Sequence, residues 1–206
     1  MSSPSARSGS AAAAASASAG SVRLINPSLA GLRLLVAGNL VAAGRELGLT
    51  FGQSPWPDDP EMREGLAVHL SACEHNPRDL PWRVHLIVDD ADAVVGPSGF
   101  KGGPGRTGEL EIYWCVEPRW RGKEIAKASA ATLCAHAFER GAVSAITATI
   151  AWHNVPSQHV ATALGMHLVE RALKHGLPLW RVDRDAWRPV ATAHDVQMAP
   201  GPASDT

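Results

Sequence analysis

A strand, a short basic turn and a helix follow one another in the middle of the chain, and this order most limits the folds open to it. Glu109 to Val116 has the alternation of a strand, and Pro118 ends it because proline cannot donate to a sheet ladder. The pattern then changes to a helix from about Lys123 to Arg140, and Ser144 to Ile150 predicts another strand. A strand, a helix and a strand in this order require a parallel pair joined by a crossover.

Shorter patterns before and after this crossover predict the remainder of a mixed sheet. Before it we expect a strand at Leu32 to Val36, then a helix through Leu40, Gly44 and Leu47, and a second helix that opens at Asp59 and Pro60. Two antiparallel strands follow, at Arg83 to Val88 and Ala93 to Gly99. After it we expect a helix from Asn154 to Leu164 and a hairpin around Lys174 to Gly176. These elements predict an α/β fold in which helices flank a mixed sheet.

Size and charge exclude several classes of protein. The 206 residues, 45% of them hydrophobic, suit a single domain. A net charge of -1 predicts no broad basic surface, so we expect neither nucleic acid nor membrane as a partner. Three widely spaced cysteines, Cys73, Cys115 and Cys134, argue against a disulfide framework and a structural zinc site. We therefore expect a cytoplasmic protein without a bound metal.

The two ends of the chain differ in composition from its middle. Residues 1–21 are almost wholly Ser, Ala, Gly and Pro, which bury too little apolar surface to offset the entropy of ordering. Residues 188–206 are rich in Pro, Ala and Asp and show no periodicity. We expect disordered tails over 1–21 and 188–206 and one folded domain over 22–187.

The turn after the central strand concentrates positive charge at the start of a helix. Arg119, Arg121, Lys123 and Lys127 lie together with the unpaired backbone N–H groups that every helix start presents. Such a turn is suited to a pyrophosphate, but the same residues also fit a solvated helix start that binds nothing. The glycine patterns of nucleotide triphosphatases and of dinucleotide-binding folds are absent from it.

The turn resembles that of the GNAT superfamily of N-acetyltransferases, which has the motif [QR]-x-x-G-x-[GA] after its fourth strand. Arg121 to Ala126 occupy that register, and Arg121 and Ala126 match two of its three defining positions. Other segments resemble the branch that contains the RimJ and RimL acetyltransferases, and together they span Leu32 to Asp185: Val95-Gly96, Gly99 to Gly102, Glu111 to Tyr113, Asn154 to Ser157, Leu164 to Met166, and Pro178 to Trp180.

This resemblance implies an acetyl-CoA-dependent transfer of an acetyl group to a primary amine, either a protein N-terminus or a small amine. It also implies a GNAT fold with a six- or seven-stranded sheet flanked by about four helices, in a monomer or homodimer. In the family the fourth and fifth strands splay apart to receive the pantetheine arm. The implied donor site comprises Cys115, Val116, Arg121, Gly122, Lys123, Glu124, Ile125, Ala126, Lys127 and Asn154.

Glu124 departs from the family pattern because it stands at the first obligatory glycine. A carboxylate there adds negative charge beside the pyrophosphate, and its Cβ restricts close approach of the backbone. Either the side chain turns to solvent and binding is weakened, or the chain is a degenerate GNAT domain that acts as a regulatory or interaction module. An unrelated α/β domain that binds another phosphate is a third reading.

Acetyl transfer to an amine also needs groups that manage protons, because amines with a pKa of roughly 8 to 10 are mostly protonated near neutral pH. Glu111 is the candidate base, although a strand carboxylate is as often a buried ion-pair partner. By analogy with the family, Ser157 would give a proton to the departing thiolate. Asn154 suits a helix cap as well as a pantetheine contact. Trp56 and Tyr113 are expected to border the acceptor.

Overall fold

The computed structural model describes residues 21–52 and 60–199, and within them nine strands form one mixed sheet. The order across the sheet is β7-β8-β6-β5-β4-β3-β1-β9, with β2 beside β4. The strands are β1 Val22–Ile25, β2 Thr50–Phe51, β3 Val84–Asp89, β4 Ala93–Phe100, β5 Glu109–Trp114, β6 Ala145–Thr149, β7 His167–Lys174, β8 Leu177–Asp183 and β9 Val196–Ala199.

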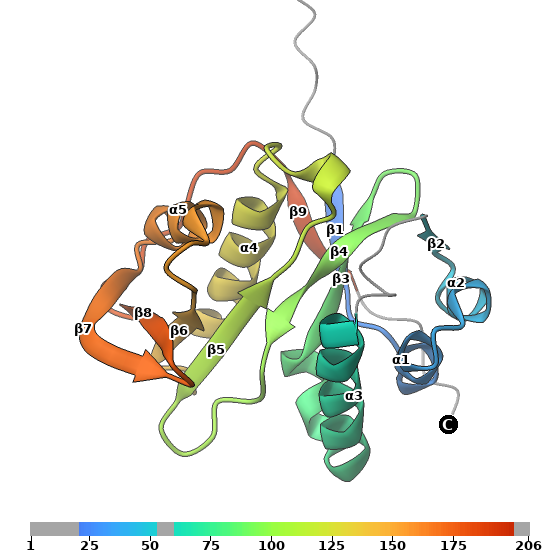
Figure 1. Cartoon of the computed structure of the whole chain (residues 1–206), viewed down its shortest axis with the longest axis horizontal. Coiled ribbons are helices and arrows are strands. Elements are labelled where there is room, and N and C mark those ends of the chain that lie inside the picture. Colours follow the sequence, from blue (N-terminus) through green and yellow to red (C-terminus); the bar gives the residue numbers. More distant parts are fainter. Residues whose placement is uncertain (1–20, 53–59, 200–206) are drawn as a thin grey trace, which may run out of the picture.

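Helices cover the sheet on two sides. They are α1 Leu29–Val36, α2 Leu40–Leu47, α3 Pro60–His75, α4 Ile125–Glu139 and α5 Val155–Ala163, with short 3-10 helices η1 Pro77–Trp82 and η2 Pro118–Trp120. Figure 1 places α1, α2 and α3 on one side of the sheet and α4 with α5 on the other. Each side buries its own hydrophobic cluster, so the sheet is covered on both faces.

The crossover predicted from the sequence is confirmed. β5 and β6 are parallel, with Glu109 opposite Ala145, and α4 connects them. The predicted antiparallel hairpins are present as β3 with β4 and β7 with β8. The expected mixed α/β class therefore holds, although the described residues form nine strands and five α-helices rather than six or seven strands and about four helices.

The prediction of a strand at Leu32 to Val36 is wrong, because these residues belong to helix α1. Ser28 caps the helix by accepting a hydrogen bond from the Gly31 N–H at 3.0 Å. Leu32 and Leu35 are fully buried, one turn apart on the same face. A short apolar run does not distinguish a buried strand from a buried helix, and this run forms a buried helix.

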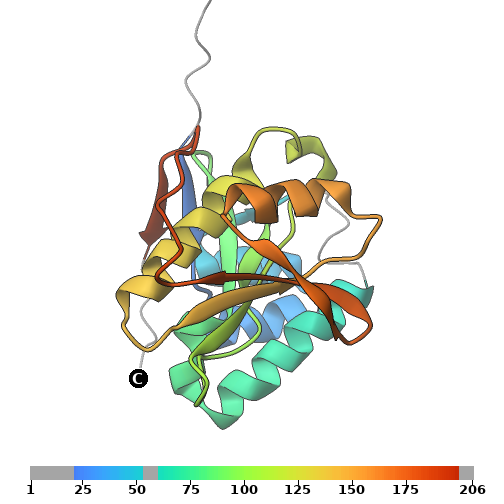
Figure 2. The same ribbon diagram turned by 90° about the vertical axis from the view of Figure 1, so that its left-hand side faces the viewer.

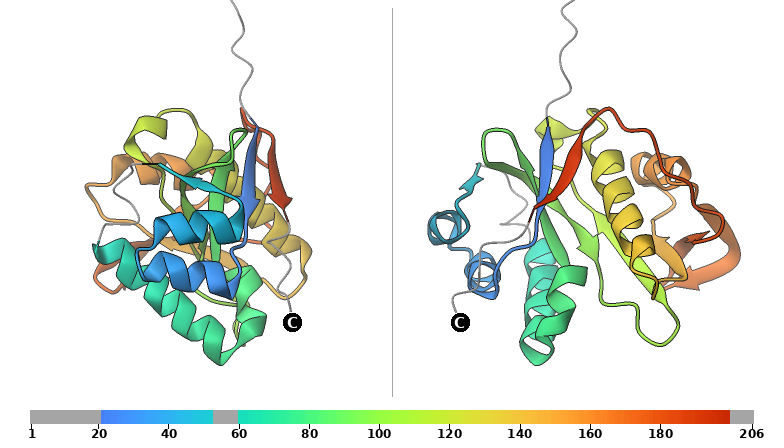
Figure 3. Two further views of the ribbon diagram at one scale, coloured as in Figure 1. Left: turned by 90° about the vertical axis from the view of Figure 1, so that its right-hand side faces the viewer. Right: turned by 180° about the vertical axis from the view of Figure 1, so that it is seen from behind.

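The carboxyl-terminal segment also differs from the expectation of a disordered tail over 188–206. Val196–Ala199 forms β9, which pairs parallel with β1, and Figure 3 shows the two strands side by side. Val190, Val196 and Met198 pack against the hydrophobic cluster beneath α4. The partner strand lies at the other end of the sequence, and no local pattern announces such a pairing. Of the other expected tail, 1–21, only Ser21 lies within the described residues.

Candidate functional site

The sheet opens between its two central parallel strands. β5 pairs with β6 only from Glu109 to Glu111, opposite Ala145 to Thr147. Beyond that point β5 stays with β4, up to Trp114, and β6 stays with β8, up to Thr149. Because the strands are parallel, the segments that follow them emerge at the same edge of the sheet, where α4 and α5 begin. Ligands in open α/β sheets bind at such an edge.

The turn that follows β5 presents a row of unpaired backbone donors. Among the described residues, the N–H groups of residues 122–127 donate no hydrogen bond. The first bond of helix α4 runs from the Ala128 N–H to the Glu124 carbonyl at 3.0 Å. Gly122 has a positive φ of 76° that reverses the chain ahead of the helix. This end of α4 therefore has the donors and the dipole that favour an anion.

The four cations of the turn contact groups of the protein itself. The Arg121 Nε donates to the Val116 carbonyl at 2.9 Å, and the Arg119 Nε lies 2.9 Å from a carboxylate oxygen of Glu117. The Lys123 Nζ lies 4.5 Å from the ring centre of Trp120. The fourth, Lys127, binds Glu124. The side chains predicted to surround a pyrophosphate are thus engaged with neighbours.

Glu124 holds a backbone conformation that glycine adopts more readily. Its φ of 59° and ψ of 7° lie in the left-handed region, at the N-cap of α4. Its side chain makes no capping hydrogen bond and is 50% exposed, with Oε1 2.5 Å from the Lys127 Nζ. Of the two outcomes expected for this residue, the geometry matches the one in which the carboxylate turns to solvent and is offset by a lysine.

Glu111 is the centre of a buried ionic cluster at the point where the two strands separate. Its Oε1 lies 2.5 Å from the Lys101 Nζ and accepts from the Thr149 hydroxyl at 2.7 Å, while its Oε2 lies 2.6 Å from the Lys174 Nζ. Burial raises the pKa of the carboxyl, but hydrogen bonds from Lys101, Lys174 and Thr149 outweigh burial and lower the pKa overall. Glu111 is therefore ionised and a weak base.

Tyr113 lies two residues further along β5 and stacks on His69 of α3, with ring centres 5.4 Å apart. Among the described residues, the Tyr113 hydroxyl and the His69 Nδ1 are buried without a hydrogen-bond partner. Burial, assisted by the charges of Arg83 and Lys101, lowers the pKa of His69 to about 4, so the ring is neutral at pH 7. Burial raises the pKa of Tyr113. This pair lies under α3, the side of the sheet opposite α4.

The residues predicted on α5 lie in its first turn. The Asn154 side chain caps the helix by accepting from the Ser157 N–H at 3.2 Å, which confirms the cap interpretation. Within the described residues, the Ser157 hydroxyl makes no hydrogen bond and the residue is half-buried. Cys115 and Val116 follow β5 into the turn, and the Cys115 N–H is bound to the Pro97 carbonyl. Trp56 lies outside the described residues.

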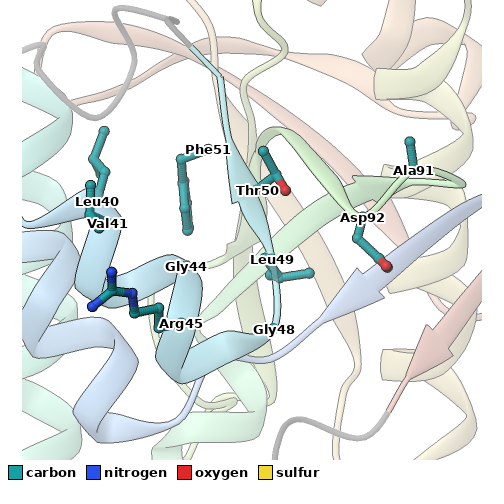
Figure 4. Close-up of a pocket in the computed structure, with 10 residues that line it drawn as sticks. All are labelled: Leu40, Val41, Gly44, Arg45, Gly48, Leu49, Thr50, Phe51, Ala91 and Asp92. Atoms are coloured by element: carbon teal, nitrogen blue, oxygen red, sulfur yellow. The ribbon is translucent and has the colours of Figure 1, made fainter.

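A surface hollow lies away from this opening. Figure 4 shows it between α2 and the β3–β4 turn, lined by Phe51, Arg45 and Asp92 among others, with a volume of about 500 Å³. In the described part of the chain, no group of three or more His, Cys, Asp or Glu side chains is arranged to hold a metal. None of the helices in that part is long and apolar enough to cross a membrane.

Several contacts of the site were not predicted from the sequence. Lys101, Lys174 and Thr149 come from three separate segments and meet only at Glu111. Likewise, His194 reaches the Lys123 carbonyl across a separation of 71 residues. Lysine and histidine are common on protein surfaces, and no local sequence spacing distinguishes Lys101, Lys174 and His194 from other surface residues.

A mixed sheet that opens between parallel strands, with a helix start at the opening, agrees with the α/β fold expected for an acetyltransferase. The chain belongs to the GNAT family, because the family model described as an acetyltransferase (GNAT) domain matches residues 40–167, more than half of the sequence. No curated protein matches the chain at a significant level.

Solved structures of the same fold have low sequence identity to the chain. A RimL ribosomal-protein alpha-N-acetyltransferase in complex with coenzyme A is 17% identical, with a TM-score of 0.56, over 81% of this chain and 96% of that one. A spermidine N-acetyltransferase SpeG chimera from Vibrio cholerae and hSSAT is 17% identical, with a TM-score of 0.54, over 80% and 96%. An acetyltransferase from Agrobacterium tumefaciens is 17% identical, with a TM-score of 0.53, over 77% and 88%. At these identities the likeness concerns the fold alone.

Proposed function

We propose that this GNAT domain is an acetyl-CoA-dependent N-acetyltransferase that acts on a primary amine. The observation that carries the proposal is the opening between β5 and β6, whose pairing ends at Glu111 and Thr147, together with the unpaired N–H groups of residues 122–127 at the same edge. The opening offers strand edges to an extended amide-containing arm, and the turn offers donors to a pyrophosphate.

The residues present fit acetyl-CoA, which supplies an activated thioester when bound. The backbone donors of residues 122–127 would bind the two phosphates, and Glu124 holds the left-handed conformation that glycine adopts readily. The β5 segment beyond Glu111, continuing to Cys115 and Val116, would line one side of the arm. The cost of Glu124 is electrostatic, since its carboxylate holds Lys127 and adds a negative charge near the phosphates.

On the acceptor side, Glu111 is suited to receive an ammonium group. It already binds the primary ammonium groups of Lys101 and Lys174, both about half exposed. An acceptor amine that replaces one of them would be held as an ammonium at the opening and would then release its proton before attacking the thioester. Because the pKa of Glu111 is lowered, this residue positions the amine more than it strips the proton.

The departing thiolate would meet the other wall of the opening. Ser157 lies in the first turn of α5, which begins shortly after β6 ends. Its hydroxyl, which has no partner among the described residues, would donate a hydrogen bond to the departing thiolate, and the proton that the amine releases would pass through water to that thiolate or to bulk solvent. The acceptor itself is either a protein N-terminus or a small amine; the neighbours named above act on a ribosomal protein and on spermidine.

One observation favours the alternative of a degenerate domain. Arg119, Arg121, Lys123 and Lys127 all contact protein groups, so the turn offers a pyrophosphate fewer free cations than its sequence suggests. Such a domain would act by interaction rather than by catalysis.

A thiol-release assay with acetyl-CoA and a panel of amines separates the two functions. The panel should include peptides with free N-termini, spermidine and lysine, with reaction products identified by mass. The proposed function predicts acetylated product on at least one amine and faster release in Glu124→Gly. An absence of amine-dependent release in both the wild type and Glu124→Gly supports the degenerate domain.

A further inference from the structure

The chain beyond β8 returns along the whole length of helix α4. We call residues 184–199 the carboxyl-terminal strap. The strap begins near the end of the helix, where the ring centres of Trp187 and Phe138 lie 5.5 Å apart. It ends in β9. Just before β9, the Asp195 carbonyl accepts a hydrogen bond from the N–H of Val22, the first residue of β1. Figure 2 shows the strap in red, rising beside α4 before it turns down into β9. The strap lies outside the region matched by the family model, which ends at residue 167.

The strap contacts the backbone of the turn through His194. The His194 Nε2 lies 2.5 Å from the Lys123 carbonyl oxygen. Since a carbonyl only accepts, the ring nitrogen donates. In a trans peptide the C=O and the N–H of the following residue point in opposite directions. Holding the Lys123 carbonyl toward the strap therefore directs the Glu124 N–H away from the strap.

The residue whose N–H is oriented in this way is the strained one. Glu124 is left-handed at φ 59°, a conformation that a non-glycine residue keeps only where its surroundings fix it. Its carbonyl accepts from the Ala128 N–H, and its side chain forms the ion pair with Lys127. His194 adds a hydrogen bond to the peptide that joins Lys123 to Glu124.

We propose that His194 is a positioning residue for the donor site, and that the strap keeps the Lys123–Glu124 peptide oriented for binding where other family members rely on glycine. This inference rests on the proposed function, because the oriented N–H is one of the donors assigned to the pyrophosphate. His194 acts through the backbone and touches no reacting atom. The strap thereby offsets the loss of glycine at position 124.

Calorimetry with coenzyme A on the folded full-length chain tests the proposal. His194→Ala is expected to weaken coenzyme A binding about fivefold, the value of one ordinary hydrogen bond. His194→Gln, which retains an N–H donor, should recover part of the affinity. His75→Ala is the matched control, because its ring also binds a backbone carbonyl, that of Ser71 at 2.7 Å, away from the turn. An unchanged affinity in His194→Ala would overturn the proposal.

A double variant separates positioning from general damage. The effect of His194→Ala on coenzyme A affinity should be about fivefold in the wild type and should nearly vanish in the Glu124→Gly background, since glycine takes the left-handed conformation without support. In turnover, His194→Ala should raise KM for acetyl-CoA and leave kcat nearly unchanged. A fivefold loss that persists in the Glu124→Gly background would mean that His194 does not act through residue 124, and would overturn the proposal.

Amide hydrogen exchange on the ligand-free protein distinguishes failure of this inference from failure of the proposed function. The Ala128 amide, bound to the Glu124 carbonyl, should exchange about fivefold faster in His194→Ala. The Leu164 amide at the end of α5, bound to the Val160 carbonyl, should keep its rate. Equal rates at Ala128 in both proteins would refute the strap whether or not coenzyme A binds.

Discussion

The Glu124 carboxylate lies 2.5 Å from the Lys127 ammonium, one helical turn away and directed to solvent. This pair explains how a carboxylate stands at a glycine position of the donor turn without entering the site. It also occupies a cation of the turn that we propose to bind the phosphates. The pair therefore preserves the shape of the turn while it reduces the positive charge available there.

Replacing Glu124 should separate these two effects. Glu124→Gly relieves the left-handed conformation and frees Lys127, so we expect a free energy of unfolding higher by about 1 kcal/mol and tighter acetyl-CoA binding. Glu124→Gln keeps the strain and removes the charge, so its stability should change by less than about 0.5 kcal/mol while binding still tightens. Chemical denaturation and calorimetry measure the two quantities. Weaker binding in both variants would contradict this account of Glu124.

Glu111 offers a test of the acceptor side. Glu111→Gln should raise the KM for the amine about tenfold, and so lower the rate at subsaturating amine, because the amide no longer attracts an ammonium group. Glu109→Gln is the matched control: it lies two residues earlier on β5, is paired with Arg181 and is 44% exposed. Thiol release at saturating acetyl-CoA provides the rates. Equal rates in Glu111→Gln and the wild type would remove Glu111 from the mechanism.

Lys174→Met should shift the pH dependence of the same reaction. The Lys174 hydrogen bond helps to lower the pKa of Glu111, so its loss raises that pKa toward the usual value. Because the ionised carboxylate is the form that holds the amine, the acidic limb of the rate profile should move to higher pH. An acidic limb that stays in place, or moves to lower pH, would show that Glu111 does not control it.

Ser157→Ala should slow thiol release about tenfold without changing acetyl-CoA affinity, since its hydroxyl would donate only to the leaving group. Thr162→Ala on the same helix is the control, because its hydroxyl bonds the Gln158 carbonyl in the ordinary helical manner. Asn154→Ala, by contrast, removes the cap and should cost about 1 kcal/mol of stability. A Ser157→Ala rate equal to that of Thr162→Ala would exclude this hydrogen bond to the thiolate.

Stability should fall in mild acid because of His69. Burial lowers its pKa in the folded chain to about 4, against an ordinary value of 6.5, so between these two pH values the unfolded chain binds a proton that the folded chain does not. The stabilisation is complete above about pH 6.5 and is lost progressively down to about pH 4. His69→Phe should flatten the dependence by about 1–3 kcal/mol. Thermal midpoints of the wild type and His69→Phe between pH 7 and pH 4.5 measure this difference. An equal loss of stability in both proteins would contradict the role of His69.

The sequence was most informative where the structure is local. The crossover from β5 through α4 to β6 follows from alternation, a proline stop and helical periodicity, and its residue bounds were predicted to within two residues. The cap at Asn154 was likewise predicted, because it depends on a bond to Ser157, three residues on. The strand predicted at Leu32 to Val36 failed because a short apolar run suits either kind of buried element.

Contacts between distant segments were not predictable in the same way. β9 pairs with β1, Lys174 reaches Glu111 across the sheet, and His194 reaches Lys123. Each depends on where the fold brings a common surface residue, and none has a local signature. The sequence showed that Glu124 stands at a position where the family has glycine, but it did not predict that Glu124 would take the left-handed conformation.

Titration of the wild-type chain with acetyl-CoA in a calorimeter tests the central claim most directly, because every role assigned to the turn and to the opening depends on donor binding. The account predicts saturable binding at one site per chain, tightened in Glu124→Gly and weakened by salt. No detectable binding in either protein would contradict it.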